Sequence, residues 1–188
     1  MDRREAIGKI SLILSGTIIG AEFFLSGCKS DPKKISYLFT AEDIIFLNEV
    51  AETIIPETNT PGAKAAQVGK FMTVMVNDCY NPEEQKIFVD GMTTLKEQCK
   101  EQYGVNFIDL DARKKTEFLK TIIKEQNKTA KNKDIQPPTH YFKMMKELTL
   151  LGYFTSEVGC TMARRYIPIP GKYIGCLPYK KGDKAWAT

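Results

Sequence analysis

Apolar side chains recur at spacings of three and four residues along most of this sequence, the periodicity of an amphipathic α-helix. No segment of useful length alternates apolar and polar residues, so the pattern predicts no β-strands. Five helices and a short sixth are expected, over residues 41–55, 63–80, 82–103, 109 or 111 to 127, 139–151 and 156–165. We therefore predict an all-α fold, with a single helical domain of about five or six helices over residues 40–166 and an extended, irregular C-terminal tail over 167–188.

Residues that cap or break helices mark the boundaries of these segments. Thr40 and Asp43 form a capping-box pattern at the start of the first helix. Asn81 followed by Pro82 is typical of a helix start, because proline at the first helical position needs no backbone N–H. Gly104 is a natural stop, because glycine readily adopts the left-handed conformation that ends many helices. Further stops or bends are expected at Pro56, Asn127 and Gly152.

The first 28 residues have the composition of an export signal. Two adjacent arginines, Arg3 and Arg4, precede a weakly apolar run over residues 10–25, which contains Glu22. This run is too short and too rich in small residues to cross a bilayer comfortably, which takes about 20 predominantly apolar residues. The paired arginines indicate the twin-arginine route, which carries folded cargo.

The signal ends in Leu25-Ser26-Gly27-Cys28, which resembles a bacterial lipobox. Cleavage before Cys28 and acylation of this residue would hold the protein stably on a membrane. Residues 29–39 then predict a tether. We expect a periplasmic protein that is lipid-anchored to a bacterial membrane. The alternative is an uncleaved anchor helix in which Cys28 is an ordinary residue.

Composition limits the number of domains, the kinds of partner and the disulfides that this chain can have. Without the signal, the chain has about 160 residues, which suits one domain with its own core. The 27 lysines and arginines are scattered among 23 aspartates and glutamates, a pattern typical of solvated helix faces, so no nucleic-acid partner is expected. If Cys28 carries lipid, four cysteines remain, and three pairings are open: Cys79, Cys99, Cys160 and Cys176. The candidate disulfide joins Cys160 to Cys176, which would attach the tail to the last helix.

Few residues in the chain are suited to catalysis or cofactor binding. The glycines do not fall in a phosphate-loop spacing, and the cysteines form no CxxC pair for zinc. The single histidine, His140, precedes an expected helix and is interpreted as a surface or capping residue. The carboxylate pairs Glu42/Asp43 and Asp109/Asp111 lie where helix N-termini favour negative charge. We therefore expect no catalytic, cofactor-binding or metal-binding residues in this chain.

The tail is unusual because it combines aromatic residues with recurring proline and glycine. Such a segment cannot form regular structure, yet its apolar side chains need a surface to cover them. Either the tail wraps around its own helices, or it lies on another protein, where tyrosine and tryptophan are typical anchors. The candidate interface residues are Tyr153, Phe154, Tyr166, Tyr173, Tyr179 and Trp186.

Several segments together resemble the small-subunit (subunit 3) family of gluconate 2-dehydrogenase. They are ELTLLGYFTSEVG at 147–159, Arg165-Tyr166, Pro170-Gly171-Lys172-Tyr173, Gly175-Cys176 and the closing PYKKGDKAW at 178–186. The segment DIIFLNEVAETIIPETNTPGAKAAQV at 43–68 resembles that family's first helix, its Ile-Pro-Glu-Thr-x-Thr-Pro-Gly loop and the following helix. The resemblance covers most of the chain.

The resemblance implies a non-catalytic subunit that serves as export escort, anchor and stabiliser. Its partner would be an FAD-containing large subunit of the glucose–methanol–choline (GMC) type, often with a cytochrome c subunit that carries haem c. The large subunit commonly lacks a signal of its own, so the small subunit would carry it out folded. The lipobox departs from soluble members of the family and implies a membrane-tethered complex. The alternative function is a stand-alone helical envelope lipoprotein that acts as a binding module.

Overall fold

A computed structural model describes residues 38–130, 140–169 and 171–187. Arg3, Arg4, Cys28 and residues 29–37 of the expected tether lie outside the described residues. The helices are α2 (Ala41–Ile54), α3 (Val68–Cys79), α4 (Pro82–Tyr103), η2 (Phe107–Asp109), α5 (Ala112–Ala130), α6 (Tyr141–Thr155) and η3 (Gly159–Ala163), where η2 is a 3₁₀ turn and η3 a π-helical turn. The described part of the chain contains no strand, so the all-α prediction is confirmed.

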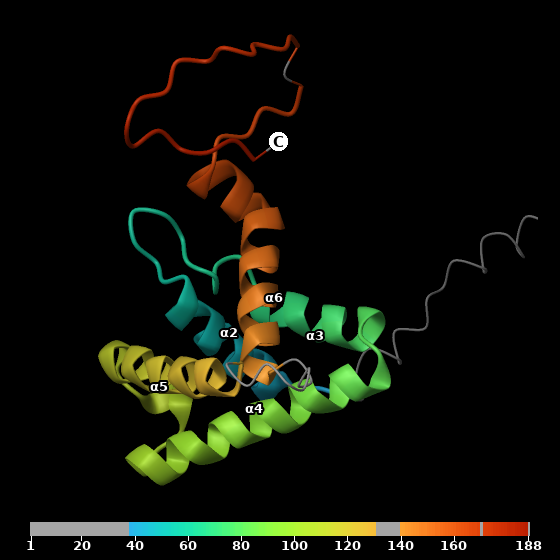
Figure 1. Cartoon of the computed structure of the whole chain (residues 1–188), viewed down its shortest axis with the longest axis vertical. Coiled ribbons are helices and arrows are strands. Elements are labelled where there is room, and N and C mark those ends of the chain that lie inside the picture. The colour runs from blue at the N-terminus through green and yellow to red at the C-terminus, as the bar shows by residue number, and fades with distance from the viewer. Residues whose placement is uncertain (1–37, 131–139, 170, 188) are drawn as a thin grey trace, which may run out of the picture. The chain divides into compact units, whose positions relative to one another are not determined.

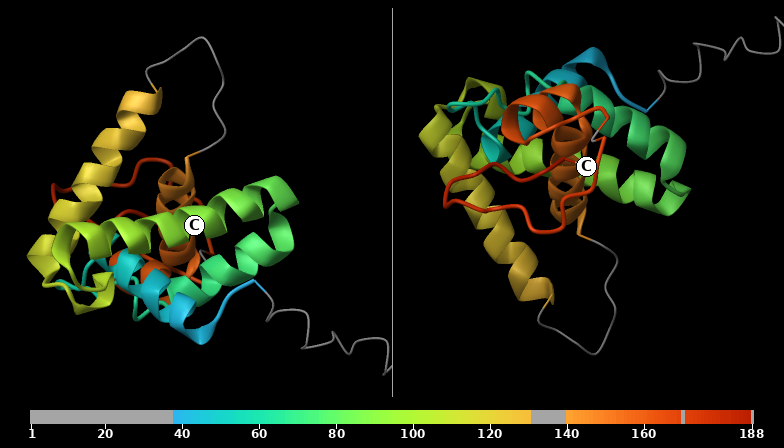
Figure 2. Two further views of the ribbon diagram at one scale, coloured as in Figure 1. Left: turned by 90° about the horizontal axis from the view of Figure 1, so that it is seen from below. Right: turned by 90° about the horizontal axis from the view of Figure 1, so that it is seen from above.

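The last long helix, α6, lies among the other four (Figures 1 and 2) and packs against α2, α3, α4 and α5. The core is formed by the apolar faces that the periodicity predicts. Its largest fully buried side chains include Phe88, Phe118, Phe142, Leu47, Met72, Leu95, Ile122 and Met145. Each such side chain stabilises the fold by about 1.5 to 3 kcal/mol relative to full exposure. No described helix combines the length and apolar character that crossing a bilayer requires.

The predicted helix boundaries are largely confirmed. Asp43 N donates to Thr40 Oγ1 at 3.2 Å and Thr40 N donates to Asp43 Oδ2 at 2.9 Å, which completes the capping box of α2. Asn81 caps α4 in the same way, with Pro82 at its first position. Gly104 ends α4 with φ of +73°, which glycine adopts without strain. These boundaries follow from local chemistry, which explains why the sequence predicts them.

Helix α3 begins at Val68, five residues later than the periodicity predicts. Residues 63–67 form turns instead, and Gln67 has a positive φ of 52°. The cause is tertiary, because Glu52 Oε2 accepts a hydrogen bond from Lys64 N at 2.7 Å and holds this segment against the end of α2. The chain must therefore turn before α3 can begin.

Two glycines allow neighbouring helices to pack closely. Helix α6 does not end at Gly152, where a bend or a stop was expected, but continues to Thr155. A Cβ at Gly152 would lie 2.6 Å from Phe71 Cδ1, so this glycine makes room for α3. A Cβ at Gly69 would lie 2.6 Å from the backbone oxygen of Ile44, which lets α3 approach α2 closely.

The helical domain begins earlier than expected. The sequence places Phe39 at the end of a tether, but its side chain is buried and packs edge-on against Phe88, with ring centroids 6.0 Å apart. An aromatic residue just before the cap of α2 can reach α4, and this contact fixes how the chain enters the domain. At the other end, the short sixth helix is present and ends in η3 at Ala163.

Candidate partner interface

The C-terminal tail is a closed loop rather than a free end (Figure 1). Arg165 N donates to Ala185 O at 2.8 Å, and Ala187 N donates to Arg165 O at 2.8 Å. These two bonds form an isolated parallel bridge between Arg165 and Trp186. We call residues 166–185 the tail loop, since the bridge joins its two ends.

The Arg165 side chain reinforces this closure. Its Nε donates to Lys184 O at 2.8 Å, and one terminal nitrogen lies 3.3 Å from Asp183 Oδ2. The guanidinium carbon also lies 5.0 Å from the centroid of the Trp186 ring, a cation–π distance. We call Arg165, Asp183 and Trp186 the Arg165 clasp. Its ion pair is about one-third exposed, so the closure depends on several contacts acting together.

Four of the six residues predicted for the interface are exposed. Their exposed fractions are 95% for Tyr173, 76% for Tyr179, 44% for Tyr166 and 41% for Trp186. The first three lie in the tail loop, and Trp186 closes its base. The tail therefore leaves its aromatic side chains largely uncovered by its own helices.

The other two interface candidates, Tyr153 and Phe154, pack against the helical domain. Tyr153 is 2% exposed, and its hydroxyl donates to Pro61 O at 2.7 Å. Phe154 is half-buried under Arg164, whose guanidinium carbon lies 4.4 Å from the ring centroid. The assignment of Tyr153 to a partner interface is corrected, because a buried tyrosine needs an internal partner for its hydroxyl and has found one.

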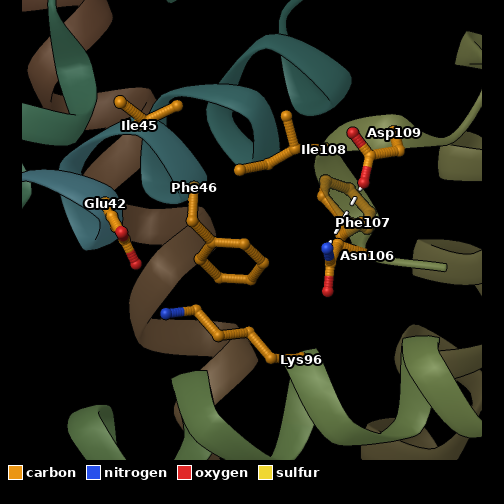
Figure 3. Close-up of a pocket in the computed structure, with 8 residues that line it drawn as sticks. All are labelled: Glu42, Ile45, Phe46, Lys96, Asn106, Phe107, Ile108 and Asp109. Atoms are coloured by element: carbon orange, nitrogen blue, oxygen red, sulfur yellow. Dashed lines mark hydrogen bonds between the residues drawn. The ribbon is translucent and has the colours of Figure 1, made fainter.

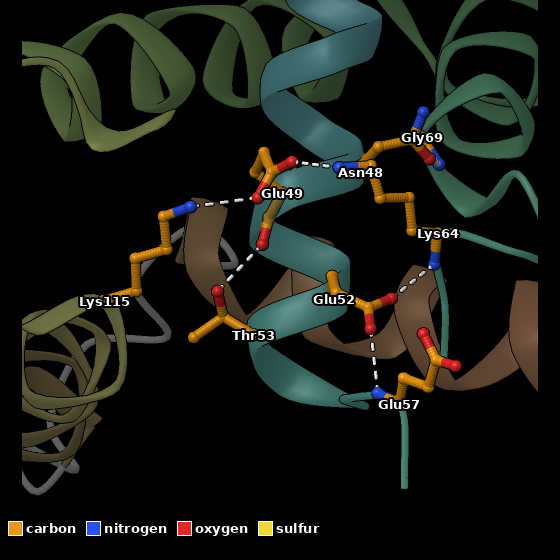
Figure 4. Close-up of polar contacts among 8 residues, drawn as sticks. All are labelled: Asn48, Glu49, Glu52, Thr53, Glu57, Lys64, Gly69 and Lys115. Atoms are coloured by element: carbon orange, nitrogen blue, oxygen red, sulfur yellow. Dashed lines mark hydrogen bonds and ion pairs between the residues drawn. The ribbon is translucent and has the colours of Figure 1, made fainter. Parts of the chain in front are cut away.

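The loop over residues 55–62 is fastened to α2 by Glu52 (Figure 4). Its carboxylate accepts hydrogen bonds from Glu57 N at 2.8 Å and from Lys64 N at 2.7 Å. A Cβ at Gly62 would lie 2.2 Å from Glu52 Oε1, so a larger residue there would have to displace this carboxylate. Together with the Tyr153 hydroxyl on Pro61 O, these contacts give the loop a defined shape.

Glu49 joins α2 to two distant lysines (Figure 4). Its carboxylate pairs with Lys115 of α5 at 2.9 Å and also with Lys64. Burial raises the pKa of Glu49, but hydrogen bonds from Lys64 and Lys115 outweigh this effect and bring the pKa below its ordinary value. The sequence does not predict this pair, because Lys115 is 66 residues from Glu49 and no local pattern connects them.

Asp43 and His140 both have structural roles at helix starts. Asp43 caps α2 and pairs with Lys96. Burial raises the pKa of Asp43, but hydrogen bonds from Lys96 and Thr40 bring it below its ordinary value. His140 caps α6, accepting from Phe142 N at 3.2 Å, and burial lowers its pKa. This confirms the capping interpretation of His140.

A half-open cavity of about 300 Å³ lies between α2, α4 and η2 (Figure 3). Lys96 lies along the ring of Phe46 on one side, with its Nζ 4.9 Å from the ring centroid. Asn106 Nδ2 donates to Asp109 Oδ2 at 3.3 Å on the other. The cavity is lined by Glu42, Ile45, Phe46, Lys96, Asn106, Phe107, Ile108 and Asp109. This lining contains no serine, cysteine or histidine that could serve as a nucleophile with its base.

The candidate disulfide between Cys160 and Cys176 is not formed in the structure. Both are free thiols, as are Cys79 and Cys99. Cys160 Sγ instead donates to Phe154 O at 3.2 Å. The contacts that close the tail include the hydrogen bonds, the ion pair and the cation–π contact of Arg165. Among the described residues, no three His, Cys, Asp or Glu side chains gather as a metal site would require.

A comparison with protein families identifies the chain. The model of the family described as gluconate 2-dehydrogenase subunit 3 matches residues 41–171. The chain belongs to this family. The match begins with α2 and extends into the tail loop, so the subunit 3 family includes both the fastened loop at 55–62 and the start of the tail. The family is named for one subunit of a dehydrogenase complex. Comparisons with curated proteins and with solved structures found no match.

Proposed function

We propose that this chain is the non-catalytic small subunit of a periplasmic, membrane-tethered, FAD-dependent sugar or alcohol dehydrogenase, such as gluconate 2-dehydrogenase. It escorts a large GMC-type flavoprotein through export, anchors it to the membrane and stabilises it. The FAD belongs to the large subunit, and a cytochrome c subunit with haem c completes the electron path in complexes that contain one. This chain holds neither group.

The observation that carries the proposal is the exposed tail loop in a member of the subunit 3 family. The closed loop carries Tyr173, which is 95% exposed, and Tyr179, which is 76% exposed. Large aromatic side chains are typical anchors of protein–protein interfaces, and monomeric proteins seldom leave many of them together in solvent. A subunit that functions within a complex accounts for this surface.

The N-terminal sequence supports the escort and anchor roles. Arg3 and Arg4 form the pair that the twin-arginine route reads, and this route carries folded cargo. A flavoprotein that has already bound FAD can therefore leave the cytoplasm attached to this chain. Acylation of Cys28 would then keep the complex on the membrane.

The first experiment solubilises membranes in mild detergent and captures the full chain through a tag placed after Thr188 on a flexible linker. We expect a second, larger polypeptide and the visible absorbance of flavin in the eluate. An untagged chain that assembles to the same extent in native gels shows that the tag does not block binding. A colourless eluate with a single polypeptide would contradict the proposal and favour the stand-alone lipoprotein.

The escort role is tested by replacing Arg3 and Arg4 with lysine. We expect both this chain and the flavoprotein to remain in the cytoplasm, whereas Lys9→Arg, a matched change in the same basic region, leaves export intact. Export of the flavoprotein alongside the double variant would refute the escort role. The anchor is tested separately by Cys28→Ser, which should leave the complex assembled and release it from membranes.

A further inference from the structure

Exposed apolar side chains gather in the last part of the chain. Of the fifteen large apolar residues that are exposed among the described residues, eleven lie between Leu150 and Trp186. Ile169 is 84% exposed and Tyr173 is 95% exposed, although both belong to types that usually find cover. Eight of the eleven lie after Arg165, and this concentration distinguishes the tail from the helical domain.

The same segment carries the positive charge of the molecule. Residues 164–188 contain six lysines and arginines and one carboxylate, which is a net charge of +5. The formal charge of the whole chain is +4, so residues 1–163 together carry −1. A surface that fits the tail therefore combines apolar area with negative charge.

The backbone of the tail loop favours a protein surface over a lipid one. Between Tyr166 and Tyr179, the described residues make no backbone-to-backbone hydrogen bond with one another or with other described residues. Their N–H and C=O groups would lack partners in the hydrocarbon of a bilayer, at a cost of several kcal/mol each. A protein surface supplies donors and acceptors for such a segment.

The Arg165 clasp joins the two ends of the loop before the loop meets a partner. It joins Arg165 to Asp183 and Trp186, which lie 18 and 21 positions further along the chain. Asp183 Oδ2 also accepts from Lys180 N at 3.0 Å, which orders the turn next to the clasp. Closing a loop before binding reduces the ordering cost that the complex must overcome.

We propose that the tail loop, held closed by the Arg165 clasp, is a preformed docking loop for a protein groove with an apolar floor and a carboxylate rim. This inference rests on the proposed function, because the groove is assigned to the large flavoprotein subunit. Tyr173 and Tyr179 enter the apolar floor, and Lys172, Lys180 and Lys181 face the rim.

The test uses the detergent-solubilised complex of the full chain with its flavoprotein. Association and dissociation of the two subunits are followed by biolayer interferometry at low and high salt. Replacing Tyr173 and Tyr179 with alanine should speed dissociation at least about tenfold, as for interface anchors. Replacing Lys172, Lys180 and Lys181 with glutamate should slow association and remove most of its dependence on salt. The matched controls are Ile45→Ala with Ile108→Ala, and Lys86→Glu with Lys120→Glu, which change exposed residues outside the tail.

The clasp is tested by Arg165→Ala and Trp186→Ala, compared with Trp186→Phe, which keeps an aromatic face for Arg165. Both alanine variants should weaken the complex by about three- to tenfold, in line with the cost of ordering a loop. They should also speed hydrogen exchange of the amides at positions 165 and 187 in the uncomplexed chain, because these two N–H groups donate across the bridge. Trp186→Phe should behave like the wild type, and far-UV circular dichroism should show unchanged helices in all three.

Three results would overturn the inference. If the complex forms but the tyrosine variants dissociate like the wild type and the lysine variants associate like it, the docking loop is wrong while the proposed function stands. If no flavoprotein co-purifies with the chain, the proposed function is wrong, and the inferred docking groove is wrong as well. If residues 166–179 become protected from exchange on phosphatidylglycerol nanodiscs without the flavoprotein, the loop binds a lipid surface instead.

Discussion

Replacing Tyr153 with phenylalanine removes one hydroxyl group and leaves the packing of the ring unchanged. This hydroxyl donates to Pro61 O at 2.7 Å, and Tyr153 is 2% exposed. The substitution breaks a contact between residues 92 positions apart, which fastens the 55–62 loop to α6. A buried acceptor left without its donor costs about 1 to 3 kcal/mol. We expect the lower half of this range, because Pro61 is only half-buried.

Urea unfolding measures this loss when it is followed by far-UV circular dichroism. Fluorescence is unsuitable, because the single tryptophan, Trp186, lies in the tail and does not report on the helices. The midpoint should fall while the slope of the transition stays the same, since the surface exposed on unfolding does not change. In a thermal scan the melting temperature should fall by about 2 to 4 °C per kcal/mol.

Tyr173→Phe is the matched control, because it removes the same hydroxyl from a side chain that is 95% exposed. Its effect on the free energy of unfolding should be within about 0.5 kcal/mol. If Tyr153→Phe is as stable as this control, the bond to Pro61 does not fasten the loop. If the slope of the Tyr153→Phe transition also changes, the variant has altered more than one contact.

Three further predictions follow from particular contacts. Glu49→Gln should destabilise the fold by about 2 kcal/mol at pH 7, since Lys115 loses its anionic partner. Because the pKa of Glu49 is lowered in the folded state, the wild type keeps this advantage above the unfolded pKa of about 4.3 and loses it as pH falls through the folded pKa. Urea unfolding of both proteins at several pH values measures the difference. Gly69→Ala should cost about 1 to 3 kcal/mol in the same assay, although alanine favours helix, because its Cβ meets backbone; Lys70→Ala, its exposed neighbour, is the control. Maleimide should label exposed Cys176 faster than buried Cys99, whose pKa is raised by burial, and mass spectrometry of timed samples checks the order.

Helix positions were open to prediction because their causes lie within a few residues. Thr40 and Asn81 begin helices through side chains that reach backbone N–H groups three positions away. Gly104 ends a helix through its own φ. The apolar faces of α2 to α6 follow from a period of 3.6 residues, which any single segment displays.

The resemblance to the subunit 3 family was equally a property of the sequence, since it rests on short motifs at the two ends of the domain. These motifs identify the family without showing how they act in space. The Ile-Pro-Glu-Thr-x-Thr-Pro-Gly motif, for example, owes its shape to the carboxylate of Glu52 and the hydroxyl of Tyr153. Neither residue belongs to the motif.

Tertiary structure decided everything that depends on residues far apart in the chain. Gly152 was expected to bend or end α6, but its role is set by Phe71 on another helix. Tyr153 looked like an interface residue until the position of Pro61 gave its hydroxyl a partner. Composition could show that the tail is irregular and aromatic. Its closure by Arg165 on Asp183 and Trp186 depends on two segments meeting in space, which a one-dimensional pattern does not encode.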